Sequence, residues 1–288
     1  MAKIAVFMGG SSSEREISLR SGNAILKSLK RQGFDAYGIE LKNDNEINSF
    51  IENDYDLAYL ALHGGNGENG KFQAVLDILE KKYTGSGVLA SAITMDKKRT
   101  KIIAESMGIK TPKTYNKVSE IGIFPVIVKP ADEGSSVGLH VCNSIEDVEK
   151  ALLEIKYPII EEYIKGDELT VGVMNGKALG VLKIIPKAAE IYDYNSKYKI
   201  GGSIHEFPAK IDNIVYKKAM KTAEDIHKEL GMLGISRSDF MLKDNELYFL
   251  EVNSTPGMTE TSLIPDLATL QGYTFDDIVK LMVETFLK

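Results

Sequence analysis

The pattern of apolar and polar residues predicts alternating strands and helices in the first part of the chain. Residues 3–8 form a short apolar run that ends at two glycines, and residues 17–29 then show apolar positions at helical spacing. Residues 34–41 and 57–62 are further strand candidates, and the second leads through a glycine-rich stretch into a helix predicted over residues 72–80. Such repeats indicate a parallel sheet with helical crossovers, which binds ligands at the carboxyl ends of its strands.

Beyond residue 92 the pattern predicts strands, helices and two antiparallel hairpins. The predicted strands are residues 126–128, 159–164, 169–174, 178–185, 240–242 and 247–252. The predicted helices are residues 96–107, 145–153, 214–230 and 275–287. One hairpin turns at Asn175-Gly176, whereas residues 188–202 show no clean period and are predicted to form a long functional loop.

The second predicted hairpin, residues 240–252, brings three oxygen-bearing side chains together. Residues 244–246 are its polar loop, and a three-residue loop places Asp239 opposite Glu251, with roughly 5 Å between their Cβ atoms. Asn253 follows two positions later and therefore lies on the same face. Hard oxygen ligands without histidine or cysteine favour Mg²⁺, which shares its coordination shell with substrate phosphates. The alternative is a solvated hairpin whose acidic side chains face water.

Composition and charge narrow the class of protein. With 288 residues, of which 43% are hydrophobic and 26% charged, the chain is expected to be a soluble globular protein of two or three domains. Its net charge of −6 and pI near 5.4 argue against general nucleic-acid binding, which needs a basic face. No stretch approaches the roughly 20 apolar residues of a membrane span, and the apolar start is too short for a signal peptide. We therefore expect a cytoplasmic protein in which the single cysteine, Cys142, is a small buried hydrophobe.

Two lysines and a Gly/Ser loop are candidates for phosphate binding. Lys129 follows an apolar strand and precedes residues 133–138, whose backbone N–H groups and hydroxyls can surround a phosphate. The spacing GxxxxGK[ST] is absent, so this loop is not a P-loop. A surface turn is the alternative interpretation. Lys97 at a predicted helix start and the acidic residues of the hairpin favour a nucleotide site instead.

Further candidates lie on a strand and near the N-terminus. Residues 161–164 can offer backbone groups to a flat base and Glu168 a carboxylate to ribose hydroxyls, although a solvated edge strand explains the pattern equally well. Glu14 follows a glycine turn at a helix start, where it can accept a substrate ammonium or interact with the helix dipole. His63 ends a predicted strand and faces the same cleft, either as a ligand contact or as a structural histidine.

Several motifs in order resemble the D-alanine–D-alanine ligases, which are ATP-grasp enzymes of bacterial cell-wall synthesis. The resemblance covers nearly the whole chain, and its specificity comes from the combination of motifs. The motifs are GGSSSEREIS (9–18), ALHGGNGENG (61–70), YTGSGVLASAITMDK (83–97), VIVKPADEGSSVG (126–138), YDYNSKY (192–198), SRSDFML (236–242) and EVNSTPGMTETSL (251–263). The chain is somewhat compact for the family, and Asn69 stands where many relatives have an aspartate. Neither difference touches an expected catalytic position.

The resemblance implies an α/β fold of three domains in the ATP-grasp architecture. An N-terminal parallel α/β domain (residues 1–92) would precede a central domain (93–182) and a C-terminal domain (183–288), both α+β, with ATP held between these two. Such ligases join two D-alanine molecules through a D-alanyl phosphate and release ADP and phosphate. Their product enters peptidoglycan synthesis, and with it cell-wall biogenesis and the maintenance of cell shape. The family commonly forms homodimers.

The resemblance also implies the nucleotide and metal contacts. Lys97 and Lys129 would meet the α- and β-phosphates, residues 161–164 would present a hinge to adenine, and Glu168 would contact the ribose. The full set of implied ATP-binding residues is Lys97, Lys129, Ser136, Glu161, Glu162, Tyr163, Ile164, Glu168 and Lys197. Lys197 would neutralise the γ-phosphate. The implied metal ligands, for two Mg²⁺ or Mn²⁺ ions, are Asp239, Glu251 and Asn253.

The implied amino-acid contacts lie in four motifs. Glu14 would bind the ammonium of the first D-alanine, with His63 beside it, and the carboxylate of that D-alanine would attack the γ-phosphate. Arg237 and the backbone N–H of Gly257 would stabilise the oxyanion that forms when the second D-alanine attacks. Ser262 and the backbone N–H of Leu263 would hold the carboxylate of the second D-alanine.

A hydrogen-bonded bridge of Tyr198, Ser135 and Glu14 would close a loop over the site and exclude water from the acyl phosphate. Tyr198 also favours an amine over a hydroxyl acceptor, because family members that make the D-alanyl–D-lactate ester lack a tyrosine there.

Three other classes of function compete with this assignment. Another ATP-grasp carboxylate–amine ligase would use a different amino acid. A non-catalytic nucleotide-binding regulator would keep Lys97 and Lys129 but could lose Arg237 or the metal ligands, and none of these is lost. A nicotinamide-dependent oxidoreductase is disfavoured because the fingerprint G-x-G-x-x-G is absent from residues 9–18.

Overall fold

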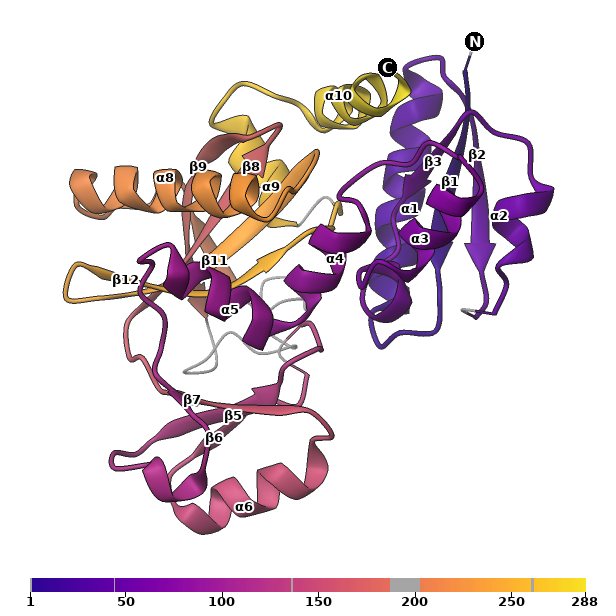
Figure 1. Cartoon of the computed structure of the whole chain (residues 1–288). Coiled ribbons are helices and arrows are strands. Elements are labelled where there is room, and N and C mark those ends of the chain that lie inside the picture. The colour runs from indigo at the N-terminus through magenta and orange to yellow at the C-terminus, as the bar shows by residue number, and fades with distance from the viewer. Residues whose placement is uncertain (1, 44, 136, 187–202, 260–261) are drawn as a thin grey trace.

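Three sheets flanked by helices form the framework of the molecule (Figure 1). The computed structural model describes residues 2–43, 45–135, 137–186, 203–259 and 262–288. The described part contains a parallel N-terminal sheet, a four-stranded antiparallel sheet and a five-stranded antiparallel sheet. This arrangement confirms the α/β class with a parallel N-terminal part and α+β parts after it.

The N-terminal sheet has the order β2-β1-β3, with both outer strands parallel to β1. Its strands are β1 (Lys3–Gly9), β2 (Asp35–Leu41) and β3 (Leu57–Leu60). The helices around it are α1 (Arg15–Arg31), α2 (Asn48–Glu52), the 3₁₀ turn η1 (Gly65–Gly67) and α3 (Lys71–Ile78). β1 is buried from Ile4 to Gly9, as expected for the central strand of a parallel sheet covered on both faces. The predicted βα repeat is confirmed, whereas the short helix α2 was not predicted.

Two further helices lead from the N-terminal sheet to the other two sheets. These are α4 (Val88–Met95) and α5 (Lys97–Ser106), joined at Asp96. The side chain of Asp96 caps α5 because it accepts hydrogen bonds from the backbone N–H groups of Lys98 and Arg99. The cap fixes the start of α5 and therefore the position of Lys97, its first residue.

The four-stranded sheet has the order β4-β7-β5-β6 and one covering helix. Its strands are β4 (Thr114–Tyr115), β5 (Val126–Pro130), β6 (His140–Cys142) and β7 (Pro158–Glu162), with the 3₁₀ turn η2 (Val118–Glu120) and the helix α6 (Ile145–Glu154). Val148 and Ala151 of α6 pack against Val126 and Val128 in a small core of their own. Cys142 joins that core and is 1% exposed, which confirms its expected role as a buried hydrophobe.

The five-stranded sheet has the order β10-β9-β8-β11-β12, and all its pairs are antiparallel. Its strands are β8 (Asp167–Met174), β9 (Lys177–Pro186), β10 (Ser203–Glu206), β11 (Ile235–Lys243) and β12 (Glu246–Asn253), and its helices are α8 (Asn213–Glu229), α9 (Leu263–Thr269) and α10 (Phe275–Leu287). The expected domain boundary at residue 182 falls inside β9. Because β8 and β9 form one continuous ladder, we propose that the boundary lies between β7 and β8 instead.

The two predicted hairpins differ in how well their turns were anticipated. The turn at Asn175-Gly176 is confirmed, with positive φ at both residues. The turn between β11 and β12 has two residues, Asp244 and Asn245, with φ of 51° and 62°. The predicted three-residue loop was therefore wrong, because Asn and Asp tolerate the left-handed conformation that a tight hairpin turn needs.

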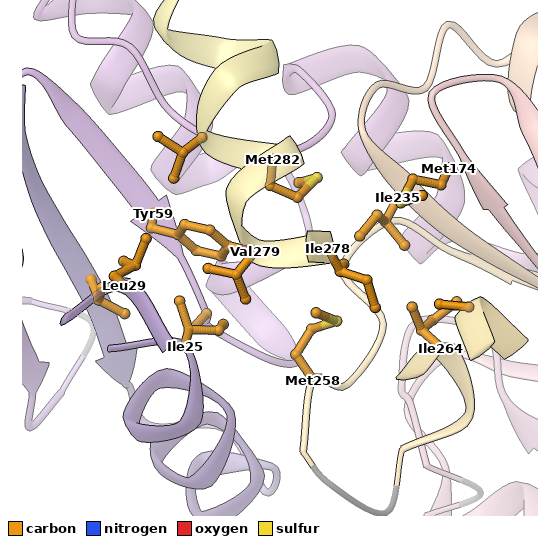
Figure 2. Close-up of a cluster of buried hydrophobic side chains, with 14 of the residues drawn as sticks. Ile25, Leu29, Tyr59, Met174, Ile235, Met258, Ile264, Ile278, Val279 and Met282 are labelled. Carbon is orange, nitrogen blue, oxygen red and sulfur yellow. The ribbon is translucent and has the colours of Figure 1, made fainter. Parts of the chain in front are cut away.

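A hydrophobic core joins the N-terminal sheet to the five-stranded sheet, with α10 in its centre. Figure 2 shows Ile278, Val279 and Met282 of α10 between two groups of side chains. One group consists of Ile25, Leu29 and Tyr59, and the other of Met174, Ile235 and Ile264. Each fully buried aliphatic side chain contributes roughly 1.5–3 kcal/mol, so this core holds the two parts in a fixed relation. No helix among the described residues is both long and apolar enough to cross a membrane.

Candidate active site

A cavity of about 470 Å³ is lined by residues of both antiparallel sheets. It receives side chains from β5 and β7 on one side and from β8, β9, β11 and β12 on the other. The lining includes nine of the residues predicted to bind nucleotide or metal, namely Lys97, Lys129, Glu161, Glu162, Tyr163, Ile164, Glu168, Asp239 and Glu251. Residues that lie up to 154 positions apart in the sequence are thus brought to one site.

Lys97 projects from the start of α5 toward the acidic end of this cavity. Its Nζ donates a hydrogen bond to the carbonyl oxygen of Glu133 at 2.5 Å and lies 3.1 Å from Glu251 Oε2. Its backbone N–H donates to the carbonyl of Ala131, so helix and loop are tied together at this point. The ammonium is therefore held between the Gly/Ser loop and β12.

Lys129 is held by a buried carboxylate on the neighbouring strand. Its Nζ lies 2.8 Å from Glu161 Oε2, and Lys101 Nζ lies 2.5 Å from Glu161 Oε1. Burial works against the charge of Glu161, but Lys129 and Lys101 outweigh it and hold the pKa of that carboxyl below its usual value. Burial also works against the charge of Lys129, and Glu161 and Glu251 outweigh it, so that the pKa of Lys129 is raised. The sequence did not indicate Lys101, which looks like one more lysine of a charged helix.

Asp239 and Glu251 are directly opposite in the ladder between β11 and β12, as predicted. The carboxylate of Asp239 accepts hydrogen bonds from Arg237 Nε at 3.0 Å, from Thr170 Oγ1 at 2.5 Å and from Asn253 Nδ2 at 3.3 Å. Within the described residues there is no cluster of three His, Cys, Asp or Glu side chains that could hold a metal. Two carboxylates and an amide still form a hard oxygen donor set, and in this structure Arg237 and Lys97 neutralise the carboxylates.

A smaller cavity of about 70 Å³ adjoins the first, and Glu251 lines both. Its lining includes eight predicted catalytic, substrate-binding or metal-binding residues besides Glu251, namely Glu14, His63, Ser135, Arg237, Asn253, Gly257, Ser262 and Leu263. A site of this size suits a small molecule such as an amino acid better than a nucleotide. The two cavities together therefore place a small acidic pocket beside a large one that contains lysines.

Glu14 lies at the N-cap of α1 and is 8% exposed. The hydroxyl of Ser135 donates a hydrogen bond to Glu14 Oε1, so the predicted contact between these two residues is present. A Cβ atom at Gly64 or Gly134 would lie 2.8 Å or 2.9 Å from Glu14 Oε2. Glycine at both positions gives the carboxylate the space it occupies.

His63 connects the small cavity to the loop that carries Gly257. Its Nδ1 lies 3.0 Å from the carbonyl oxygen of Thr255, and its Nε2 lies 3.1 Å from Ser21 Oγ. Ser21 Oγ also accepts a hydrogen bond from the backbone N–H of Met258. Both ring nitrogens thus have protein partners, which favours a structural role within the lining of the site. Burial lowers the pKa of His63, but the neighbouring Glu68 outweighs this effect and the pKa is raised.

Comparison with known proteins assigns the family. Residues 94–284 match the family model described as D-ala D-ala ligase C-terminus. A D-alanine--D-alanine ligase from Fusobacterium nucleatum is 70% identical over 286 residues, which are 99% of this chain and 100% of that protein. The chain belongs to the D-alanine–D-alanine ligase family. Another ligase of this name, from Aquifex aeolicus, is 40% identical over 98% of the chain and 99% of that protein.

Solved structures of the D-alanine–D-alanine ligase family share the fold. The ligase from Bacillus anthracis has a TM-score of 0.87 at 33% identity, covering 100% of this chain and 98% of that one. The same ligase complexed with ATP has a TM-score of 0.85 at 30% identity, covering 100% and 97%. A D-Ala:D-Ser ligase from Enterococcus faecalis has a TM-score of 0.84 at 27% identity, covering 99% of each chain.

Against this family background, some predicted residues lie outside the described part of the chain and some described residues were not predicted. Ser136, Lys197 and Tyr198 lie outside the described residues. Glu68, which lines the small cavity 3.6 Å from His63, was not predicted. Burial raises its pKa, and the contact with His63 offsets this only in part. Three more charged or polar residues were not predicted: Lys101 contacts Glu161, Thr170 contacts Asp239, and Lys183 lines the large cavity and pairs with Asp167 at 2.7 Å.

Proposed function

We propose that the chain joins two D-alanine molecules to D-alanyl-D-alanine while ATP is converted to ADP and phosphate. The observation that carries this proposal is the junction of the two cavities at Glu251, beside Asp239, in a chain of this family. A reaction that transfers phosphate to an amino-acid carboxylate needs a nucleotide and an amino acid at adjoining sites. The product supplies peptidoglycan precursor synthesis.

The large cavity binds ATP with its phosphates toward Lys97 and Lys129. Phosphoryl transfer depends chiefly on alignment and on neutralisation of charge, and the two partly buried ammonium groups of Lys97 and Lys129 at the acidic end of the cavity supply part of both. Residues 161–164 and Glu168 line the rest of the cavity, where the base and ribose would lie. The sequence also predicts that Lys197 and Ser136 contact the ATP.

The residues at the junction fit divalent metal ions. Asp239, Glu251 and Asn253 would hold Mg²⁺ or Mn²⁺, since their oxygen atoms suit hard cations. In this structure Arg237 and Lys97 already place positive charge beside the same two carboxylates. Bound there, the metal would neutralise charge on the nucleotide phosphates.

The small cavity binds the amino acids. Glu14 holds the ammonium of the first D-alanine, whose carboxylate oxygen bonds to the γ-phosphorus while the bond to ADP breaks. The amine of the second D-alanine then attacks the acyl carbon, phosphate leaves and the amine loses a proton. Arg237 and the N–H of Gly257 face the developing oxyanion, and Ser262 with the N–H of Leu263 holds the second carboxylate.

Tyr198 joins Ser135 and Glu14 to shield the acyl phosphate from water. We further expect a homodimer located in the cytoplasm.

Phosphate release tests the proposal. With Mg·ATP, addition of D-alanine is expected to start phosphate release and D-alanyl-D-alanine formation, whereas L-alanine is expected to give neither. D-Lactate or D-serine added with D-alanine reports the choice of acceptor, and the dipeptide of D-alanine is expected to dominate. Folded protein that releases no phosphate in response to D-alanine would overturn the proposed function.

A further inference from the structure

Lys101 lies behind the nucleotide cavity and does not line it. It is 3% exposed, whereas Lys129 and Glu161, its neighbours in the ion-pair cluster, both line the cavity. Its ammonium contacts Glu161 Oε1 at 2.5 Å, and Lys129 contacts Glu161 Oε2 at 2.8 Å. Two cations therefore share one buried carboxylate, and only Lys129 of the two lines the large cavity.

The cluster is assembled from a helix and two strands. Lys101 follows Lys97 by four residues on α5, so both lysines project from the same side of that helix. Glu161 lies on β7 and Lys129 on β5, which are paired with Lys129 opposite Ile159. Strand periodicity puts Glu161 and Lys129 on the same face of this sheet. Lys101 thus joins the helix to the four-stranded sheet through Glu161.

Burying the charge of Lys101 is unfavourable, which indicates that the charge has a functional role. Burial lowers the pKa of Lys101 below its ordinary value even though Glu161 is in contact with it. Replacing a buried ion pair by apolar groups is often neutral or stabilising, so stability alone does not account for a third charge in the cluster. With Lys101 the cluster carries one net positive charge, and without it Glu161 and Lys129 form a neutral pair.

We propose that Lys101 is a positioning residue that neutralises Glu161 and so leaves the charge of Lys129 available to the nucleotide phosphates. If Lys101 were absent, Glu161 would hold Lys129 more strongly and phosphate binding would have to break that pair. Loss of Lys101 would therefore weaken binding of the nucleotide phosphates and leave binding of the base and of the amino acids unchanged. The inference rests on the proposed function only in that the ligand of the large cavity is a nucleotide.

Binding of Mg·ADP and of adenosine to Lys101→Met tests the proposal, since methionine removes the charge and keeps most of the side-chain length. Mg·ADP is expected to bind roughly tenfold more weakly than to the unaltered protein, while adenosine, which has no phosphate, binds as before. In turnover, KM for ATP rises and KM for D-alanine stays unchanged. The matched control is Arg99→Met, which removes one positive charge from the same helix at a side chain that is 69% exposed. It is expected to leave both affinities unchanged.

The double variant Lys101→Met/Glu161→Gln separates charge from packing. Because it removes the carboxylate that Lys101 neutralises, the ratio of Mg·ADP to adenosine affinity is expected to return to within about twofold of the original. Taking this ratio cancels any effect of the Glu161→Gln substitution on the base. If Lys101→Met does not fold, the double variant compared with Glu161→Gln alone carries the same test, and the two are expected to show equal ratios.

Two results would overturn the inference. One is an equal loss of Mg·ADP and adenosine affinity in folded Lys101→Met, which would indicate packing. The other is a double variant that keeps the reduced ratio. Since these are binding measurements without turnover, they are independent of the reaction. An unaltered protein that binds Mg·ADP but releases no phosphate with D-alanine would contradict the proposed function and leave the role of Lys101 standing.

Discussion

Asp239 faces Glu251 across the β11–β12 ladder because a tight turn and a β-bulge compensate each other. The two-residue turn at Asp244 and Asn245 pairs Phe240 with Phe249, which would set Asp239 opposite Leu250. The register shifts between Asp239 and Phe240, so that Glu251 takes the facing position instead. Bulges are common beside active sites because they redirect a side chain. Here the bulge brings a second carboxylate to the junction of the two cavities.

The pair of facing carboxylates predicts a strong effect of a single amide substitution. Asp239→Asn keeps the shape of the side chain but removes a charge that Arg237, Thr170 and Asn253 all contact. We expect D-alanine-dependent phosphate release to fall by at least about a hundredfold, with a higher Mg²⁺ concentration needed for half-maximal rate. Asp244→Asn in the turn of the same hairpin is the control, since asparagine tolerates the positive φ there. Equal activities of the two variants would contradict the assignment of Asp239.

The sequence predicted that Asp239 faces Glu251, but it did so from a three-residue turn that the structure does not have. Hydrophobic patterns therefore reveal some features of this fold and miss others. Hydrophobic periodicity located residues 275–287 as a helix with the bounds of α10, because a single face of it is buried. It missed α4, whose eight residues have no clear polar face although Leu89 is 72% exposed. It also missed β4 and β6, which are too short to show alternation.

The candidate site residues also divide into those that sequence motifs indicate and those that only tertiary packing reveals. Lys97, Lys129 and Glu14, which the sequence indicated as candidates, all line the cavities, because glycines, strand ends and helix starts mark such positions in the chain. Lys101 could not be identified, since the stretch KKRTK is typical of a solvated helix face. Only the tertiary fold buries this lysine, where α5 packs against β12 and Lys101 meets Glu161 of β7.

The space around Glu14 predicts a selective effect on the amino-acid site. In Gly134→Ala the new Cβ atom would lie 2.9 Å from Glu14 Oε2, so the carboxylate has to move. We expect KM for D-alanine to rise by roughly tenfold, the equivalent of about 1.4 kcal/mol. Gly122→Ala is the matched control, because no atom lies within 4 Å of its added Cβ. Unchanged D-alanine kinetics in Gly134→Ala would refute a role of Glu14 in substrate binding.

Tyr198 carries a prediction from the sequence alone, as it lies outside the described residues. Its hydroxyl is expected to help Ser135 and Glu14 close the site and to favour an amine acceptor. Tyr198→Phe should therefore form more D-alanyl–D-lactate, measured by product analysis with D-alanine and D-lactate supplied together. If the variant makes no more ester than the unaltered protein, Tyr198 does not set the choice of acceptor.

His227 predicts how stability depends on pH. It is 4% exposed on α8, its Nδ1 lies 2.7 Å from Ser236 Oγ, and burial lowers its pKa below the ordinary value of 6.5. Between the lowered pKa and 6.5 the unfolded chain binds more protons than the folded chain, so stability rises with pH through this window and is lost as the pH falls. The free energy of unfolding, measured by urea denaturation at several pH values between 7.5 and 5, should change less with pH in His227→Asn than in the unaltered protein. Asparagine keeps a hydrogen-bonding group near the position of Nδ1 but does not titrate. If the stability of His227→Asn changes with pH as much as that of the unaltered protein, His227 is not the source of the pH dependence.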